Sequence, residues 1–245
     1  MVVINGNISN VFRHTPAGMS ADESLLSVSA DGNVLSANPD SDAQGNSGVS
    51  ASGDNSALQK EVKMIALTFD DGPHPVYTKM LLDGLLERGV KATFFVVGKN
   101  IPGNEDLIAR MEEEGHLIGN HTYDHVKICD LKQEDACYQV EQTSALVREI
   151  TGHDTEFVRP PFGIWNSDLE CSFVMIPVLW NVDPLDWTTS NTSLVVQRVI
   201  KETEDQDIIL LHDFYKSSVE AALQIVDKLK EKGYEFVTVD KLILE

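Results

Sequence analysis

The sequence predicts an α/β fold, in which parallel strands alternate with helices. From Val62 onward, short apolar runs alternate with longer stretches that repeat apolar residues at helical spacing. The polar residues that could carry chemistry come directly after the apolar runs, where α/β barrels and open α/β sheets gather their active sites. At 245 residues and 42% hydrophobic content, the chain is long enough for one sizeable core, or for one domain with an appendage.

The first half of this pattern starts with a strand at Lys63–Phe69. A helix follows at Tyr77–Arg88, because its leucines and Met80 fall on one side. The longest predicted helix, Gln133–Ile150, stops at Thr151-Gly152. Between these helices we expect a strand at Ala92–Val97, a helix at Glu105–Glu114 and a short strand at Leu117–Gly119.

The second half continues the alternation to the end of the chain. Strands and helices that alternate in this way form βαβ units around a parallel sheet. One helix has a clear end, since Gly233 follows its last residue. The predicted elements are strands at Val174–Val182, Ile208–Leu211 and Glu235–Val239, and helices at Leu194–Glu204 and Val219–Lys232.

The segment before this pattern differs in composition. Ser, Gly, Asn, Asp and Ala dominate residues 15–57, and no helical or strand period persists there. Such a composition buries too little apolar surface to offset the entropy lost on ordering. We therefore expect a flexible stalk at residues 1–61, with a possible short docking strand at 2–4, and a catalytic domain at 62–245. The first residues lack the basic and apolar regions of a signal peptide, so the chain is either cytosolic or a mature, trimmed form.

The net charge of the chain limits the kinds of molecule that it can bind. The formal net charge is -20, from 19 Lys and Arg against 39 Asp and Glu. Such a surface repels the phosphates of nucleic acids and anionic lipids, so we expect no nucleic-acid partner. No run is apolar over a length that could span a bilayer, so we expect no membrane-spanning segment. We also expect a monomer.

Three cysteines, Cys129, Cys137 and Cys171, make an odd count, so they form no complete disulfide framework. None belongs to a Cys-x-x-Cys pair, which disfavours a thiol-zinc or redox site. We therefore expect buried free thiols, with a Cys129–Cys137 bridge as the open alternative.

Two adjacent carboxylates, Asp70 and Asp71, follow the first predicted strand in the segment Thr68–Pro73. Neighbouring side chains on an extended segment point to opposite sides, so the two have different roles. One can hold a metal ion while the other stays free as a base. With His121 and His125, Asp71 offers one oxygen and two nitrogen ligands and leaves coordination positions open.

One divalent metal ion is the cofactor we expect at this set. Zinc (Zn²⁺) suits these donors, and cobalt (Co²⁺), nickel (Ni²⁺) or ferrous iron are compatible with them. Two simpler interpretations stay open: Asp-Asp-Gly-Pro can be a turn, and a His-x-x-x-His pair can be two surface histidines on a helix. The second is weakened because the pair follows Gly119-Asn120, at the end of a predicted strand.

A water molecule could bind at an open position of this metal ion. Asp70 could then accept a proton from that water as a general base. Arg159 is the best available partner for holding that carboxylate ionised. The stiff Pro160-Pro161 pair fixes the chain, so that the backbone N–H of Phe162 could face an oxyanion. The alternative for this segment is an ordinary turn after a strand.

Asp186 could orient His212 and raise its basicity, which would make His212 a general acid for a leaving amine. Trp187 could form a wall of the pocket. The alternative for His212 is a core histidine with one hydrogen-bonded nitrogen. We expect no catalytic role for the other four histidines, although one of them follows the first motif closely enough to line a subsite. These are His14, His74 (the possible subsite residue), His116 and His153.

Together these segments resemble the polysaccharide deacetylases of carbohydrate esterase family four, which share the NodB-homology domain. The resemblance covers about Val62 to Leu244. It implies a distorted (β/α) barrel and a metal-dependent N- or O-deacetylation of acetylated sugars. Five family motifs match in order, at Thr68–Pro73, His121–His125, Arg159–Phe162, Asp183–Trp187 and Leu210–His212.

Carried over by position, the resemblance implies that Asp70 is the catalytic base. It implies that Asp71, His121 and His125 are the metal ligands and that Arg159 pairs with the base.

On the acid side, the resemblance implies that Asp186 tunes His212. Leu210 is similar to the residue that lines the pocket for the acetyl methyl, and Trp187 to its aromatic wall. Phe162 stands where many members have Tyr. Since the family uses the backbone N–H of that residue, loss of the hydroxyl should matter little.

The expected reaction is hydrolytic removal of acetyl from N-acetylglucosamine units, in peptidoglycan or a chitin-like glycan. Acetylxylan esterase activity is the alternative among enzymes. A metal-bound carbohydrate-binding domain without catalysis is the alternative from another class, and the presence of both Asp70 and His212 argues against it. A flexible stalk before such a domain suits a secreted or surface-tethered enzyme, so we expect an extracellular or cell-surface location. The segment Lys127–Ala136 matches no usable pattern and leaves the substrate groove open.

Overall fold

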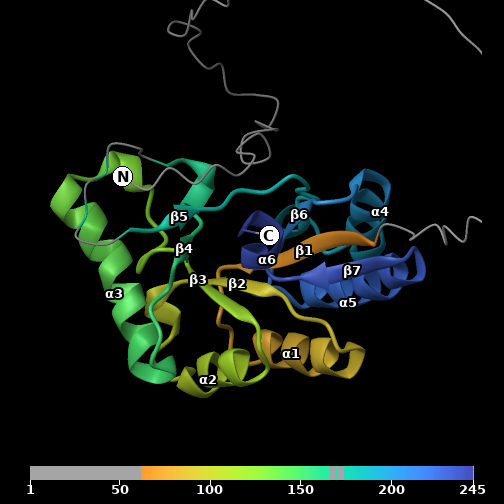
Figure 1. The fold of residues 1–245 in the computed structure, drawn as a ribbon, viewed down its shortest axis with the longest axis horizontal. Coiled ribbons are helices and arrows are strands. Elements are labelled where there is room, and N and C mark those ends of the chain that lie inside the picture. Colours follow the sequence, from red (N-terminus) through yellow and green to blue (C-terminus); the bar gives the residue numbers. More distant parts are fainter. Residues whose placement is uncertain (1–61, 166–168, 170, 172–173, 245) are drawn as a thin grey trace, which may run out of the picture. The chain divides into compact units, whose positions relative to one another are not determined.

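The computed structural model describes residues 62–165, 169, 171 and 174–244 (Figure 1). The predicted stalk and docking strand lie outside the described residues and stay predictions. The described part has the predicted α/β fold: a sheet of seven strands in which every pairing is parallel.

The sheet is built around β1 (Lys63–Asp70), the most central strand. The strand order is β5-β4-β3-β2-β1-β6, and β7 (Tyr234–Val237) pairs with the first residues of β1. The other strands are β2 (Thr93–Val96), β3 (Leu117–Asn120), β4 (Phe157–Val158), β5 (Ile176–Pro177) and β6 (Ile208–His212).

One segment connects the two edges of this sheet. We predicted a single strand at Val174–Val182, and this is wrong: residues 176–177 pair with β4 at one edge, and Val182 bridges to Ile209 of β6 at the other. Between these pairings, the carbonyls of Val178 and Leu179 accept hydrogen bonds from Arg159 instead. The segment therefore closes the sheet into the distorted (β/α) barrel that the resemblance implies.

Helices cover the outside of the sheet in the same order as the strands (Figure 1). Neighbouring helices contact each other in the order α3, α2, α1, α5, α4, which follows the order β4, β3, β2, β1, β6. This is the arrangement that consecutive βαβ units produce. The helices are α1 (Tyr77–Arg88), α2 (Glu105–Glu113), α3 (Gln133–Thr151), α4 (Thr192–Glu202), α5 (Lys216–Glu231) and α6 (Val239–Leu244).

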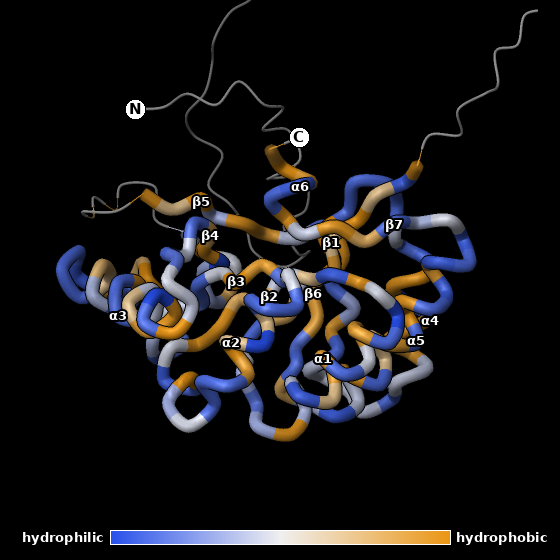
Figure 2. The backbone as a smooth tube through the Cα atoms, turned by 60° about the horizontal axis from the view of Figure 1, so that its bottom comes forward, coloured by the Kyte–Doolittle hydropathy of each residue, from blue (hydrophilic) through white to orange (hydrophobic). Residues whose placement is uncertain are grey.

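Successive side chains of β1 alternate between two environments. Ile65, Leu67 and Phe69 join the main core between sheet and helices, while Ala66 belongs to a second cluster inside the barrel. Figure 2 shows the apolar strands in the middle of the domain and mainly polar segments around them. By the same alternation, Asp70 points into the barrel.

The C-terminal helix α6 was not predicted, because we expected the last strand to run to Val239. In the structure Val239 is buried in the cluster inside the barrel, and its N–H donates to Thr93 Oγ1 at 3.1 Å. The helix therefore covers the end of the barrel where the strands begin. In the described residues, no helix is long and apolar enough to cross a membrane.

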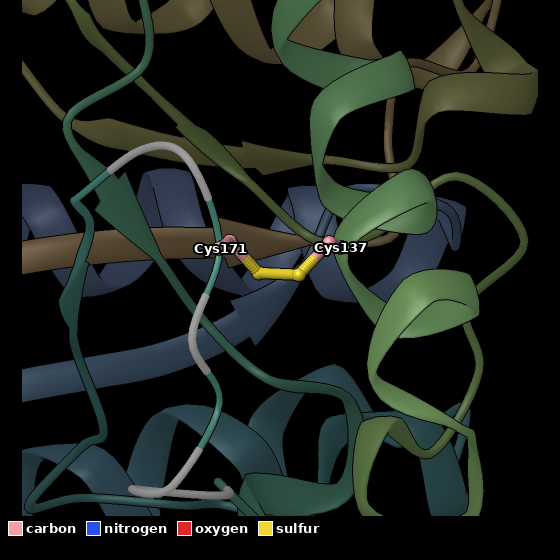
Figure 3. The surroundings of a disulfide bond; sticks show 2 residues. All are labelled: Cys137 and Cys171. Atoms are coloured by element: carbon pink, nitrogen blue, oxygen red, sulfur yellow. A yellow bond between two sulfur atoms is a disulfide. The ribbon is translucent and has the colours of Figure 1, made fainter.

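The cysteine prediction is wrong. Cys137 of α3 and Cys171 form a disulfide (Figure 3). Cys129 is free and exposed. The Cys129–Cys137 alternative is also wrong. The reason is packing that the sequence does not reveal: a small apolar cluster brings the segment after β4 onto α3. Its members are Ile128, Leu131, Ala136, Val140, Trp165, Leu169 and Met175.

Candidate active site

The two adjacent carboxylates at the end of β1 diverge as predicted. Asp70 is 3% exposed and faces Arg159, whereas Asp71 is half-buried and lies outside the strand. Asp71 has φ 75°, in the left-handed region that residues other than glycine rarely adopt. Asn100 Nδ2 donates to the Asp71 carbonyl at 2.8 Å and stabilises this turn.

Asp71, His121 and His125 form the one group of metal-ligating residues found among the described residues. One ligand atom from each lies within 4.8 Å of the others. The Nε2 atoms of His121 and His125 lie 3.6 and 3.3 Å from Asp71 Oδ1. Both histidines follow β3 in a loop rather than in a helix, so the surface-helix alternative is wrong.

The hydrogen bonding of His121 fits a metal ligand. Its Nδ1 lies 2.6 Å from the carbonyl oxygen of Arg159, which can only accept, so Nδ1 carries the proton. Burial lowers the pKa of His121 to about 3, against the opposing charge of Asp71. The ring is therefore neutral and directs the Nε2 lone pair toward Asp71, as a metal requires of an imidazole ligand. These residues would hold one divalent ion.

Around Asp70, the fully buried Arg159 contacts β1, β2 and the segment 174–182 that closes the sheet (the closing segment). Its Nη1 donates to Asp70 Oδ1 at 2.9 Å and to Thr68 Oγ1 at 2.7 Å. Its Nε and Nη2 donate to the carbonyls of Val178 and Leu179 in the closing segment, at 3.2 and 3.0 Å. The guanidinium also lies over the Phe95 ring, 4.2 Å from its centroid. Arg159 is thus fixed as the charge partner of Asp70.

Two opposing effects act on Asp70. Burial raises the pKa of the Asp70 carboxyl above its usual value, while the charge and hydrogen bond of Arg159 and the charge of His212 oppose this rise. A carboxylate with a raised pKa is a stronger base. Arg159 therefore stabilises the ionised Asp70 carboxylate, while burial keeps that carboxylate a good proton acceptor.

The half-buried His212 and the buried Asp186 form a second pair. His212 Nδ1 lies 2.8 Å from Asp186 Oδ1, and the His212 backbone N–H donates to Asp186 Oδ2 at 2.9 Å. Burial alone would lower the pKa of His212, but the hydrogen bond and charge of Asp186, with smaller effects of Asp70 and Asp71, raise it to about 9. His212 is therefore protonated at neutral pH and can donate a proton from Nε2.

The three residues predicted to contact substrate lie in different environments. Leu210 is buried on β6, while Phe162 and Trp187 are 64% and 55% exposed. The Phe162 ring packs edge-on against His125, with centroids 5.1 Å apart. Phe162 therefore borders the metal ligands, and Trp187 directly follows Asp186 on the rim.

Sequence reasoning missed Asp213, which follows His212. Its carboxyl group is fully buried, accepts a hydrogen bond from the Thr78 hydroxyl and has no partner at Oδ1. A Cβ on Gly72 would overlap the Asp213 carboxylate, so only glycine fits at this position. Burial raises the pKa of Asp213 to about 7. Its position directly after His212 was the available signal.

Backbone strain marks the same loops. Six described residues other than glycine have positive φ, and five of them are Asp71, Thr122, His125, Phe162 and Leu185. Strained backbone persists where the surrounding structure fixes it, often at functional sites. The loops after β1, β3 and β4, and the loop that carries Asp186, are therefore held in specific conformations.

Comparisons with known proteins agree with this geometry. The family model described as polysaccharide deacetylase matches residues 57–172. The peptidoglycan-N-acetylmuramic acid deacetylase PdaC of Bacillus subtilis is 40% identical over 180 residues, 74% of this chain and 38% of that protein. The peptidoglycan-N-acetylglucosamine deacetylase PgdA of Listeria monocytogenes is 38% identical over 183 residues, 75% of this chain and 39% of that protein. The chain thus spans about two fifths of the length of these two relatives.

Solved structures give the same result. The structure of PdaC from Bacillus subtilis matches with a TM-score of 0.72 and 40% identity, covering 74% of this chain and 90% of that chain. The chain belongs to the polysaccharide deacetylase family. This is carbohydrate esterase family four, as the five motifs indicate.

Within the family, a solved acetyl xylan esterase from Clostridium thermocellum is described in complex with a cobalt ion. It is 34% identical, with a TM-score of 0.69, and covers 74% of this chain and 90% of that chain. In this polysaccharide deacetylase domain, Asp71, His121 and His125 are the residues that could hold a metal ion.

Proposed function

We propose that this domain is a metal-dependent deacetylase that removes acetyl groups from N-acetylglucosamine units of a cell-wall glycan. The observation that carries the proposal is the convergence of three ligand atoms, a buried carboxylate and a protonated histidine at one end of the barrel. Hydrolysis of an acetamide needs a water to be activated, a developing negative charge to be stabilised and a proton for the departing amine.

Asp71, His121 and His125 would hold one divalent ion, for which zinc is the best candidate and cobalt or nickel are alternatives. When bound, such an ion lowers the pKa of a water and polarises a carbonyl oxygen. Asp70 takes the proton from the attacking water, and Arg159 fixes its carboxylate. The backbone N–H of Phe162 would donate to the oxyanion that forms on the acetyl carbonyl, because Phe162 packs against the proposed metal ligand His125.

His212 supplies the proton for the leaving amine. Asp186 orients the ring and raises the pKa of His212, so that the imidazolium is populated at neutral pH. Leu210 would contact the acetyl methyl, and Trp187 would pack against the sugar. Attack by water and departure of the amine are thus assigned to different residues of the site.

The setting that we propose is extracellular or at the cell surface. The disulfide supports this, because such bonds form and persist mainly in oxidising compartments. The two curated relatives are named for peptidoglycan, which favours that glycan as the substrate. The acid-rich surface favours a neutral or cationic partner over nucleic acid.

Acetate release tests the proposal. Purified full-length chain is incubated with peptidoglycan, N-acetylglucosamine oligomers and acetylated xylan, with and without a chelator. We expect release from the N-acetylglucosamine substrates and its loss after chelation. Release from acetylated xylan alone would assign the domain as an O-deacetylase. Binding without release from any substrate would indicate a carbohydrate-binding domain.

A further inference from the structure

We propose that four aromatic side chains next to the catalytic pocket bind a further sugar ring of the same glycan. The set, named the aromatic platform, comprises His74, Tyr77, Phe214 and Tyr215. This inference rests on the proposed function and adds a subsite for a sugar other than the one that loses acetyl.

The four rings form one continuous array across two loops. His74 stacks on Tyr77 with centroids 4.3 Å apart and planes at 13°. Phe214 meets His74 edge-on at 5.0 Å, and Tyr215 packs against Phe214 at 6.2 Å. Two of the rings follow β1 and the other two follow β6, so the array depends on the adjacency of these strands.

The platform residues lie close in the sequence to the candidate catalytic residues. His74 lies three positions after Asp71, and Phe214 lies two positions after His212. The two loops are tied together through Thr78, whose hydroxyl donates to Asp213 and accepts from the His74 backbone N–H at 2.7 Å. A glycan whose reacting sugar lies at Asp71 and His212 therefore passes over the platform if it extends in this direction.

The solvent exposure of Phe214 and Tyr215 supports a role in binding a ligand. Phe214 and Tyr215 are 40% and 42% exposed, and Val76, which directly precedes Tyr77, is 60% exposed. Large apolar side chains clustered at the surface of a folded domain usually mark an interaction site. The exposed aromatic residues of the described part are Tyr138, Phe162, Trp187, Phe214 and Tyr215, and all except Tyr138 lie in the loops around the pocket.

The chemistry of the platform matches a neutral sugar. His74 Nδ1 accepts the backbone N–H groups of Val76 and Tyr77, both at 3.1 Å, which fixes the ring and leaves Nε2–H as its donor in the neutral form. A pyranose presents an apolar C–H face, which packs on aromatic rings, and hydroxyl groups that accept hydrogen bonds. Rings fixed before binding lose little entropy when a sugar docks.

A structural role explains only half of the set. His74 caps the first turn of α1, and Tyr77 is its first residue, so both would be ordered without a ligand. Phe214 and Tyr215 contribute nothing to that cap. The test therefore uses Phe214 and Tyr215 and leaves the capping residues unchanged.

Acetate release from N-acetylglucosamine oligomers of two and five sugars tests the platform. In Phe214→Ala and Tyr215→Ala, the ratio of kcat/KM on the pentamer to that on the dimer should fall by about tenfold. Phe214→Trp should restore most of the ratio, because it keeps an aromatic face. Leu86→Ala is the matched control: Leu86 is exposed at the far end of α1 and should leave the ratio unchanged. Equal losses on both oligomers, or none, would overturn the platform.

A binding measurement separates this inference from the proposed function. Calorimetric titration with the pentamer should give a Kd about tenfold weaker for Phe214→Ala than for the unmodified chain. If the unmodified chain binds the pentamer more tightly than Phe214→Ala does but releases no acetate, the proposed function fails and the platform stands. If both proteins bind the pentamer equally, the platform fails whatever the outcome for acetate.

Discussion

Adjacent residues acquire different chemistry in this site because the backbone sends them into different surroundings. Asp70 still belongs to β1 and follows its alternation into the barrel, where Arg159 and Thr68 surround it. Asp71 has left the strand with a positive φ and faces two histidines. The sequence pattern predicts this divergence, but the buried network that fixes Arg159 depends on the closing segment.

The division between attack and departure predicts selective damage in His212→Ala. An amine is a poor leaving group that needs a proton, whereas a nitrophenolate departs without one. We expect kcat/KM to fall by about 10²–10⁴-fold on an N-acetylglucosamine oligomer and much less on p-nitrophenyl acetate. Equal losses on both substrates would mean that His212 is structural or acts before the leaving group departs.

The pKa of His212 predicts the alkaline limit of activity. Its folded-state pKa is raised to about 9, so the proton needed by the leaving group is present below that pH and is lost as the pH rises through it. Asp186→Asn removes the carboxylate that favours the imidazolium. The alkaline limb of kcat/KM should therefore move to lower pH in this variant, with circular dichroism as the check on folding. An unchanged limb would exclude His212 as the titrating acid.

At the scale of elements, most helices and strands were predictable from periodicity and apolar runs, and β4 and α6 were not. The helices α1 and α3 and the strands β1 and β6 lie within a residue or two of their predicted bounds. β4 has only two residues, too few to show a strand period. The apolar residues of α6 closely follow the last strand, so no clear boundary between the two elements is visible in the sequence. Asp71, His121 and His212 were predictable as candidate site residues because they lie at or directly after the ends of strands that were recognised, whereas Arg159 follows β4, which was not.

The closing segment and the disulfide were not predictable, because both depend on contacts between distant parts of the chain. Val174–Val182 is apolar enough for one strand, yet it divides its pairings between two sheet edges. Cys137 and Cys171 meet because the apolar cluster at α3 brings them together. Three cysteines without a spacing motif contain no such information.

The disulfide predicts a specific stability difference. It closes a loop of 34 positions, which should stabilise the fold by roughly 3–4 kcal/mol through the unfolded chain. The variant with both Cys137→Ser and Cys171→Ser should lose about this much free energy of unfolding in a urea titration. Cys129→Ser, at an exposed free cysteine, is the matched control and should not change it. An unchanged unfolding midpoint in the double variant would contradict the prediction.

At the scale of the whole molecule, we propose that residues 62–245 are the catalytic domain and that residues 1–61 are a linker with no part in its core. Deleting residues 1–57 should then leave both the unfolding midpoint and acetate release from short oligomers nearly unchanged. Thermal unfolding of the truncated and full chains, compared in the same buffer, checks this. A large drop in the midpoint would place part of the first segment in the folded core.

We propose that one end of the barrel separates metal binding, at Asp71, from proton transfer, at Asp70. The most direct measurement compares bound metal and acetate release in the unmodified chain, Asp70→Asn and Asp71→Asn, after dialysis and reconstitution with zinc. We predict one zinc per chain and activity in the unmodified protein, and loss of both in Asp71→Asn. Asp70→Asn should keep its zinc while turnover falls by about 10²–10⁴-fold. Full activity in the metal-free protein, or loss of zinc from Asp70→Asn but not from Asp71→Asn, would contradict the claim.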